Sequence, residues 1–280
     1  MSELPHIDRR RLDGFSLTVI DTGVTEWRPS YNAPRSEWVR KAPAIDLDGW
    51  VPLHTNALHI QTPQASILID PCSWHPAHLR VWPNVRLKES YPGAETALGA
   101  IGFSPADVTH VLMTHSHFDH CSGVATPSPS GWELIYPDAV HLLNRLDYPT
   151  ARTGSGVVFE ILHSLAERGR LKLVSGQYQV SNGVRLLPAP GETPGHMVVD
   201  VNSAGKRFIY AGDLFHFPFE LEHLDWIPEG RNLDEMIKSR TSVIDLVDGS
   251  GASMMFTHAD FPGWGTCRWA DRPRARWVAE

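Results

Sequence analysis

Four side chains able to bind metal ions lie within six positions of the sequence, at His115, His117, Asp119 and His120. They follow a β-favouring apolar run that predicts a strand over residues 108–114. In an extended segment alternate side chains point the same way, so His115 and His117 can reach one ion, while Asp119 and His120 can turn toward a second. A lone histidine is usually no ligand, but this spacing predicts a site for zinc, iron or manganese.

The segment 115–120 resembles the His-X-His-X-Asp-His motif of the metallo-β-lactamase superfamily. Three later segments resemble the remaining ligand motifs of that family, and they occur in the same order along the chain. These segments are Thr193-Pro194-Gly195-His196, Tyr210-Ala211-Gly212-Asp213 and Phe256-Thr257-His258. The resemblance extends over roughly residues 55–260.

The resemblance implies two divalent metal ions, zinc in the first place, with iron or manganese as alternatives. It implies that the first ion is bound by His115, His117 and His196, the second by Asp119, His120 and His258, and both by Asp213. Paired cations lower the pKa of a shared water and polarise a carbonyl or phosphoryl oxygen, so a bridging hydroxide is the expected nucleophile. Asp119 is also expected to move a proton as the leaving group departs. Because no ligand is missing, we expect a metal-dependent hydrolase.

The hydrophobic pattern predicts the strands and helices that position these residues. Two helices are predicted, one over 156–168 and one that begins after Asn232, whose side chain can cap the first turn while Glu235 reaches back. Strands are predicted over residues 16–21, 58–62, 66–70, 108–114, 140–143, 171–174, 184–188, 197–202, 207–211 and 253–257.

Periodicity by itself indicates only a mixed α and β protein. The resemblance implies more, namely an α/β fold of the αββα type, in which two mixed β-sheets face each other, helices flank them and the metals lie at one edge. A chain of 280 residues can form one such domain, so residues 1–280 are not divided. Residues 1–54 are expected to supply an N-terminal strand and a segment rich in Trp and Pro that serves as a lid or interface.

Composition excludes several classes of function. The net charge of −7 and the pI of about 6.1 give no basic field for nucleic acid. No apolar stretch approaches the length of a membrane span, and we expect a cytoplasmic protein without a secretory signal. Cys72, Cys121 and Cys267 are odd in number and far apart, which argues against a disulfide framework. Cys121 follows a predicted ligand, but we interpret it as a small buried residue.

Several neighbours of the ligands have two interpretations. Asp70 either orients a ligand by hydrogen bonding or is an ordinary turn residue at the end of a strand. Gly195 and Gly212 allow tight turns beside His196 and Asp213. The aromatic side chains near the site either line a pocket or lid or cover the hydrophobic core; they are Trp27, Trp38, Trp50, Phe215 and Phe219.

Order and spacing of the motifs look most like the branch that holds quorum-quenching lactonases and methyl-parathion-hydrolase-like enzymes. Those lactonases carry a tyrosine three residues after the bridging aspartate, where this chain has His216. An imidazole can also donate a hydrogen bond or a proton, so His216 is a candidate catalytic residue for a lactone or ester substrate, or else an ordinary histidine.

The leading hypothesis is hydrolysis of a lactone or ester carbonyl in a small, partly apolar substrate. The alternatives within hydrolases are an organophosphate triesterase and a thioesterase of the glyoxalase II kind. A di-iron oxidoreductase and a nuclease rank lower, because residues after 260 leave no room for a flavin domain and the chain lacks a basic arm. By analogy with the lactonase branch, in which dimers are common, the Trp-rich loops are candidates for the interface of a homodimer; neither nucleic acid nor membrane is expected as a partner.

Overall fold

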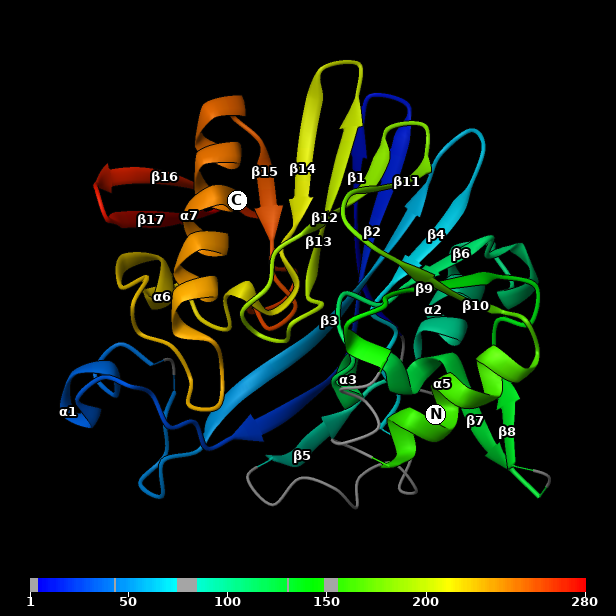
Figure 1. The fold of residues 1–280 in the computed structure, drawn as a ribbon, viewed down its shortest axis with the longest axis horizontal. Helices are drawn as coiled ribbons and strands as arrows, with labels where there is room; N and C mark the ends of the chain where they lie inside the picture. Colours follow the sequence, from blue (N-terminus) through cyan, green and yellow to red (C-terminus); the bar gives the residue numbers. More distant parts are fainter. Residues whose placement is uncertain (1–4, 43, 75–84, 130, 149–155) are drawn as a thin grey trace.

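Two mixed β-sheets lie face to face in the computed structural model, which describes residues 5–42, 44–74, 85–129, 131–148 and 156–280 (Figure 1). Helices lie on the outer side of each sheet. The predicted fold class, an αββα sandwich, is therefore confirmed. Residues 1–4 and 43 of the predicted N-terminal segment are outside the described residues.

The first sheet contains, within the described residues, eight strands in the order β1-β2-β3-β4-β6-β9-β10, with β5 beside β2. The β4–β6, β6–β9 and β9–β10 pairs are parallel, whereas the others are antiparallel. The strands are β1 (His6–Leu12), β2 (Phe15–Trp27), β3 (Val51–Gln61), β4 (Ser66–Ile69), β5 (Val85–Ser90), β6 (His110–Leu112), β9 (Val140–Asn144) and β10 (Leu171–Val174).

The second sheet has the strand order β11-β12-β13-β14-β15-β16-β17 within the same ranges, and its one parallel pair among them is β14–β15. These strands are β11 (Tyr178–Ser181), β12 (Val184–Pro188), β13 (Met197–Ser203), β14 (Lys206–Tyr210), β15 (Ser253–Met255), β16 (Gly265–Asp271) and β17 (Arg274–Ala279). A separate hairpin pairs β7 (Ala125–Ser128) with β8 (Gly131–Leu134).

The central hydrophobic core lies between the two sheets. Alternate residues of β2 and β3 point inward from the first sheet, and alternate residues of β13 and β14 point inward from the second. Burial of these side chains removes apolar surface from water and holds the sheets together. Examples are Leu17, Val19, Leu58, Ile60, Val199, Val201, Phe208 and Tyr210.

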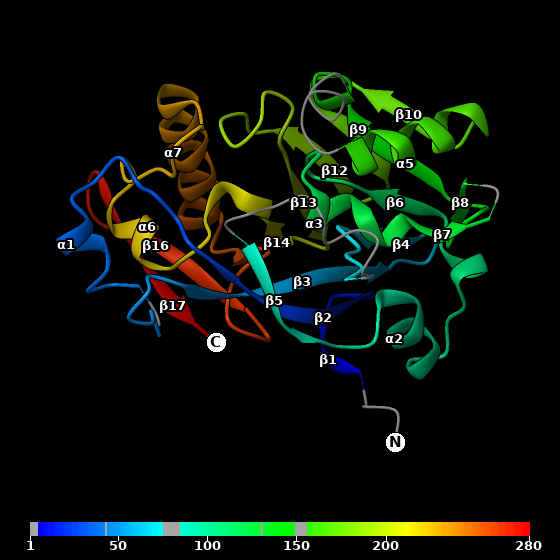
Figure 2. The ribbon, with the colours of Figure 1, turned by 90° about the horizontal axis from the view of Figure 1, so that it is seen from below.

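Helices cover the outer faces of both sheets. The first sheet is covered by α2 (Ala94–Ala100), α3 (Phe118–Cys121) and α5 (Gly156–Glu167), and the second by α7 (Leu233–Ser250). Two short helices, α1 (Arg35–Trp38) and α6 (Phe219–Glu222), lie together at one end of the molecule (Figures 1 and 2).

Both predicted long helices are confirmed. In α5 the buried positions Val158, Ile161, Leu162 and Leu165 follow the helical period. In α7 the Asn232 side chain accepts a hydrogen bond from the backbone N–H of Glu235, as the capping pattern predicts. The predicted return contact from the Glu235 side chain is wrong, because the Asn232 backbone N–H donates to Gly191 O instead of to Glu235.

The predicted strands all occur, but several have different limits. β2 and β3 are longer than predicted because they continue to pair with each other as far as Trp27 and Val51. β6 and β15 are shorter, with three residues each. The structure also contains strands without a predicted counterpart, and most of these are charged or lie at sheet edges, where only a tertiary partner makes a short segment extended. They are β1, β5, β7, β8, β11, β16 and β17.

β2 and β3 are long strands that run across the molecule (Figure 2). Thr25 and Trp27 of β2 and Leu53 of β3 line the pocket described below. The register of β2 shifts between Asp21 and Val24, and Gly23 lies in this bulge. A Cβ atom on Gly23 would lie 2.6 Å from Glu89 O and 2.8 Å from the Trp74 ring, so only glycine fits here. Beyond the bulge, β2 exchanges β1 for β5 as its second neighbour.

Asp200 on β13 is an ion-paired carboxylate of the second sheet. Its side chain is 1% exposed and accepts hydrogen bonds from Arg185 Nε at 2.6 Å and Arg207 Nε at 2.7 Å. Although burial raises the pKa of this carboxyl, the hydrogen bonds from Arg207 and Arg185 outweigh burial and lower it below its ordinary value.

We expect Asp200→Asn to lower the free energy of unfolding by about 1–3 kcal/mol near neutral pH, since hydrogen bonds to a charged group are lost. A carboxyl whose folded-state pKa is lowered stabilises the fold above its unfolded pKa of about 4, and this contribution is lost as the pH falls through the folded-state pKa. Urea unfolding at about pH 7 and about pH 3.5 measures both values. A loss of stability in the Asp200→Asn variant that is equally large at the lower pH would contradict this account.

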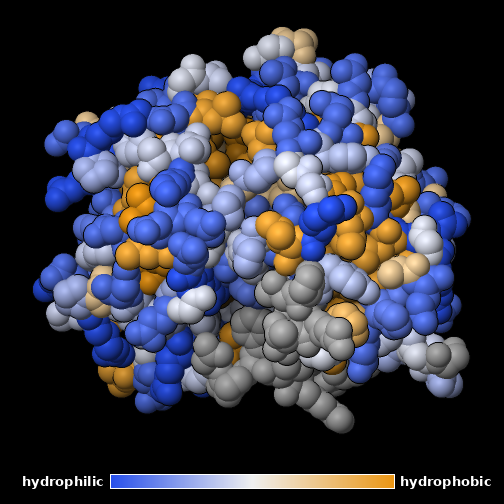
Figure 3. All heavy atoms as spheres, viewed as in Figure 1, coloured by the Kyte–Doolittle hydropathy of each residue, from blue (hydrophilic) through white to orange (hydrophobic). Residues whose placement is uncertain are grey.

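No helix among the described residues combines the length and the apolar composition that a bilayer crossing needs. On the face shown in Figure 3, hydrophobic residues form separate patches between hydrophilic side chains.

Candidate metal centre

The histidine-rich segment leaves the first sheet directly after β6 and continues into α3. The backbone N–H of Met197 donates to Thr114 O, which ties this segment to the start of β13 in the second sheet. His115 Nε2 lies 2.8 Å from His117 Nδ1, so two imidazole nitrogens converge on one point. His115 and His120 are fully buried, and the His117 side chain is 24% exposed. The segment therefore places its ligand atoms at the edge where the sheets meet.

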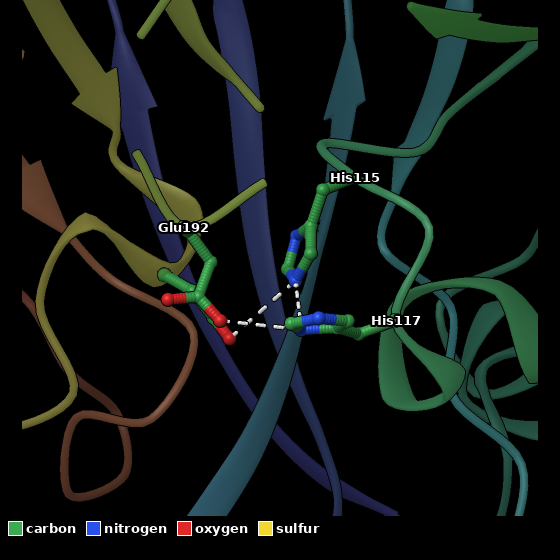
Figure 4. Close-up of side chains that lie close together, drawn as sticks. His115, His117 and Glu192 are labelled. Atoms are coloured by element: carbon green, nitrogen blue, oxygen red, sulfur yellow. Dashed lines mark hydrogen bonds and ion pairs between the residues drawn. The ribbon is translucent and has the colours of Figure 1, made fainter. Parts of the chain in front are cut away.

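Two groups of potential ligand atoms lie close together, and within each group all atoms are within 4.8 Å of one another. The first group comes from His115, His117, Glu192 and Asp213, and the second from Asp119, His120, Asp213 and His258. Asp213, which follows β14, belongs to both groups. Figure 4 shows the carboxylate of Glu192 directed at the imidazoles of His115 and His117.

Asp213 carries the evidence that cations fit here. Its Oδ2 lies 3.2 Å from His120 Nε2 and 3.3 Å from His258 Nε2. Its Oδ1 is buried and has no hydrogen-bond partner among the described residues, which is costly for a carboxylate unless a cation or water completes it. Imidazole nitrogens and carboxylate oxygens are also the donors that divalent transition metals prefer. The residues present therefore fit a pair of divalent metal ions.

The electrostatics of the cluster follow from its burial and opposite charges. Burial raises the pKa of the Asp213 carboxyl, but the nearby His120 and His258 outweigh burial and hold it well below its ordinary value. Burial lowers the pKa of His258, yet Asp213 and Asp119 raise it to about 9. Burial together with neighbouring histidines lowers the pKa of His115 well below its usual range. A cation bound between these groups would stabilise the buried carboxylate charge of Asp213, as the nearby histidines do here.

His196 is fully buried beside the cluster, with its ring centroid 5.2 Å from that of His115. Its Nδ1 lies 3.0 Å from Ala189 O, and its Nε2 accepts a hydrogen bond from the Asp213 backbone N–H at 3.1 Å. The first group of ligand atoms thus contains Glu192, where the family pattern expects His196. The ligand role of His196 stays a prediction.

Asp70 makes the hydrogen bonds that its position predicts for an orienting residue. Its carboxylate accepts from Thr114 N and Thr114 Oγ1, both at 2.7 Å, and lies 2.8 Å from His120 Nδ1. Asp70 thereby fixes both the loop and the ring of His120, which leaves Nε2 of that ring directed at Asp213.

A second buried carboxylate, Asp147, supports the opposite side of the site. It accepts hydrogen bonds from Ser116 N, Thr193 Oγ1 and Gly195 N, and so joins the histidine-rich segment to the loop before His196. This carboxylate is one structural support that the sequence motifs do not reveal.

Gly212 makes the close approach of Asp213 to His196 feasible. Its φ is +56°, and a Cβ atom there would lie 2.6 Å from His196 Nε2. The expectation that Gly212 permits a tight turn is confirmed. Cys121 is also as expected, since it is buried and its thiol donates to His115 O at 3.3 Å.

His216 lies at the edge of the second group. Its ring stacks on His258 with centroids 5.5 Å apart, and its Nε2 is 3.6 Å from Asp213 Oδ2. Its Nδ1 lies 3.6 Å from Glu220 Oε1, and Glu220 Oε2 accepts a hydrogen bond from the His216 backbone N–H. The imidazole is therefore held between the buried Glu220 and the cluster.

A pocket of about 300 Å³ opens over these groups. His117, Asp119, Asp213, His216 and His258 form its floor. Its walls combine apolar and polar side chains, as pockets for small molecules commonly do. The apolar ones are Trp27, Leu53, Trp74, Val85, Leu87, Phe118 and Pro228, and the polar ones are Thr25, Arg28, Ser30, Glu229 and Arg231.

The five aromatic residues that had two interpretations lie in different parts of the structure. Trp27 lines the pocket, as one interpretation predicts. Phe215 packs in the core under α7, while Trp38 and Phe219 pack in a small core that α1 and α6 share. Trp50 lies against Arg28 and Arg86, whose guanidinium carbons are 5.0 and 4.4 Å from its ring centroid. None of these four residues lines the pocket.

Sequence reasoning missed Glu192, Arg231, Glu220 and Asp147. For Glu192 a signal exists, because it lies four residues before His196 in the same short loop. Glu220 lies four residues after His216, which is a similar signal, but Arg231 carries none, since it gains its role from a contact with a segment distant in the sequence.

Comparison with known families gives a match to the model of the metallo-beta-lactamase superfamily over residues 50–248. Among curated proteins, a Mycobacterium bovis protein named Probable metallo-hydrolase is 26% identical over 182 residues, which are 55% of this chain and 53% of that protein. An N-acyl homoserine lactonase from Bacillus cereus is 28% identical over 113 residues, or 39% of this chain and 40% of the lactonase. These matches thus span about half or less of the relatives' length.

Two solved structures resemble almost the whole chain. One is AidC, a dizinc quorum-quenching lactonase in complex with a product, with a TM-score of 0.81 and 20% identity over 99% of this chain and 98% of that one. The other is the hydrolase AbOPH, with a TM-score of 0.82 and 18% identity over 100% and 99% of the two chains. At these identities the likeness establishes a common fold.

Proposed function

The chain belongs to the metallo-beta-lactamase superfamily, and on that premise we propose that it is a dinuclear metal-dependent hydrolase that cleaves a lactone or ester bond in a small, partly apolar substrate. The observation that carries this proposal is the position of Asp213, which is shared by two groups of ligand atoms directly beneath a pocket. Zinc is the ion we propose, because the structural neighbour AidC is a dizinc enzyme.

When bound, two divalent cations would lower the pKa of water and polarise the substrate carbonyl. The ligands we propose are His115, His117 and His196 for one ion and Asp119, His120 and His258 for the other, with Asp213 shared. Of these, Asp119 also lies in the pocket floor with its side chain 21% exposed, so it can reach both the cluster and a bound molecule. We assign to Asp119 the transfer of a proton toward the leaving oxygen.

The pocket supports the choice of substrate class. Its walls offer several apolar side chains beside the floor of ligands, which suits an acyl or aryl group attached to a carbonyl. Two similar proteins, the N-acyl homoserine lactonase and AidC, are both named as lactonases. The volume of about 300 Å³ favours a small molecule over a polymer.

A substrate panel tests the proposal. Metal-loaded protein and protein stripped with a chelator are each assayed with a lactone, an aryl ester, a phosphotriester and a glutathione thioester. We expect the metal-loaded protein to hydrolyse the lactone or the ester with the highest kcat/KM, and the stripped protein to be inactive. A preference for the phosphotriester or the thioester would replace the carbonyl-ester assignment with that alternative.

We further propose that His216 acts on the substrate, through a hydrogen bond or proton from its imidazole to the carbonyl or leaving oxygen. His216→Ala should lower kcat on the preferred substrate by about 10²-fold, at the low end of the range for general acids and bases, while the protein still binds two metal ions. Steady-state kinetics with metal analysis measures both. His163→Ala, on the exposed side of α5, is the matched control and should keep the wild-type kcat. An unchanged kcat in the His216 variant would remove His216 from the mechanism.

A further inference from the structure

Glu192 is a fully buried carboxylate in the first group of potential ligands (Figure 4). It lies in the loop between β12 and β13, so it reaches the histidines from the second sheet while they come from the first. Its Oε1 is 3.2 Å from His117 Nδ1, the atom that also faces His115 Nε2. One carboxylate oxygen and two imidazole nitrogens therefore meet at one point.

Arg231 holds this carboxylate from the side of the pocket. Its Nε donates to Glu192 Oε2 at 2.8 Å, and its Nη2 donates to Oε1 at 2.5 Å. This two-point contact fixes the plane of the carboxylate. A carboxylate has about four acceptor positions on its two oxygens, so Oε1 keeps one that faces the histidines. Arg231 thus orients Glu192 without using up its capacity to bind a cation.

His196 differs from Glu192 in how far its ligand atom is already engaged by the protein. Its Nε2 already accepts the Asp213 backbone N–H, whereas the Glu192 oxygen lies within 4.8 Å of all other ligand atoms of the first group.

We propose that Glu192 binds the first metal ion directly, as a carboxylate ligand that Arg231 holds in position. The first ion would then be bound by oxygen from two carboxylates, Glu192 and Asp213, together with the imidazoles of His115, His117 and His196 proposed above. More oxygen donors make a site more favourable for Mn²⁺ relative to Zn²⁺ than an imidazole-rich site is. This inference rests on the two-metal centre of the proposed function and adds a ligand to it.

The test is metal binding by the full-length protein after removal of metal with a chelator. Zn²⁺ is titrated against a competing chromophoric chelator, and the dissociation constants of the two equivalents are compared. Glu192→Gln keeps the shape of the side chain but removes its charge. We expect it to weaken one equivalent by more than the about 10–100-fold that loss of an orienting partner costs, and to leave the other within a few-fold of wild type.

The matched control is Glu26→Gln. Glu26 is also a shielded glutamate paired with an arginine, with Nε of Arg86 2.5 Å from its Oε2, but it lies outside both ligand groups. It should bind both equivalents as wild type does. Unchanged Zn²⁺ binding by the folded Glu192 variant would overturn the proposal.

Arg231→Gln separates a ligand from a structural ion pair. If Glu192 is the ligand and Arg231 only orients it, Arg231→Gln should weaken the same equivalent, but less than Glu192→Gln does. If the pair only stabilises the loop, the Arg231 and Glu192 variants should lose affinity to the same extent, and the proposal would fail. Circular dichroism of each metal-free variant checks that it is folded.

Co²⁺ provides a readout of the coordination itself. Substitution of one oxygen ligand changes the visible absorption of the Co²⁺-loaded protein, and we expect this change in the Glu192 variant but not in the Glu26 variant. If the Glu192 variant and the Glu26 variant both gave the wild-type spectrum, direct binding of the metal by Glu192 would be contradicted. None of these measurements uses hydrolysis, so a protein that hydrolyses no substrate of the panel can still confirm or refute the role of Glu192.

Discussion

Asp213→Ala should lose most of its capacity for both metal ions and reduce kcat/KM on the preferred substrate by at least about 10³-fold. The reason is that Asp213 belongs to both ligand groups, so its removal weakens both positions at once. Bound metal ions contribute several kcal/mol to transition-state stabilisation, and each ~1.4 kcal/mol corresponds to a factor of ten in rate. Metal content by mass spectrometry and steady-state kinetics are measured on the same preparation.

The control for Asp213 is Asp200→Asn, which alters another buried aspartate of the second sheet, outside both ligand groups. This control should bind two equivalents and keep its activity at neutral pH. If the Asp213 variant retained two tightly bound ions, the shared role of Asp213 would be wrong. Wild-type rates from the metal-free protein would refute a metal-dependent hydrolase altogether.

Arg240→Met should lower the free energy of unfolding by about 3–5 kcal/mol, as expected when one partner of a buried ion pair is removed. Arg240 and Glu220 are both fully buried, with Nη2 2.7 Å from Oε2. The guanidinium also donates to the backbone carbonyls of Leu214, Leu224 and Trp226, which would lose their donor. Urea unfolding at constant pH measures the change.

The double variant Glu220→Gln with Arg240→Met distinguishes lost pairing from lost packing. It removes both charges, so much of the destabilisation caused by Arg240→Met alone should be recovered. Glu220 also accepts hydrogen bonds from the Tyr31 hydroxyl and the His216 backbone N–H, so some loss will remain. A double variant that is as unstable as the sum of the two single variants would show that the charges do not interact.

The part of the centre that the sequence predicts is the part encoded by local motifs. His115, His117, Asp119 and His120 follow one strand, so the local backbone places them near one another, although Asp70 and Asp147 fix the segment. The order of the remaining motifs indicates the family and hence the sandwich, which periodicity cannot establish.

The features that were missed depend on contacts between distant segments. Glu192 meets Arg231 across 39 positions of the chain, and no local pattern announces this pairing. The same holds for the edge strands β1 and β5, whose charged sequences become extended only against β2. Phe215 follows a predicted ligand closely, yet the chain turns it into the core under α7.

The pocket wall and the metal ligands come from different parts of the chain, and this has a consequence for how the protein can diversify. Thr25 of β2, Leu53 of β3, and Val85 and Leu87 of β5 lie on these three strands and shape the pocket wall, while the ligand atoms come from the segments that follow β6, β12, β14 and β15. Mutation can therefore remodel the wall while the reactive centre is inherited intact. Selection on those four positions offers a route to new substrate ranges within one lineage.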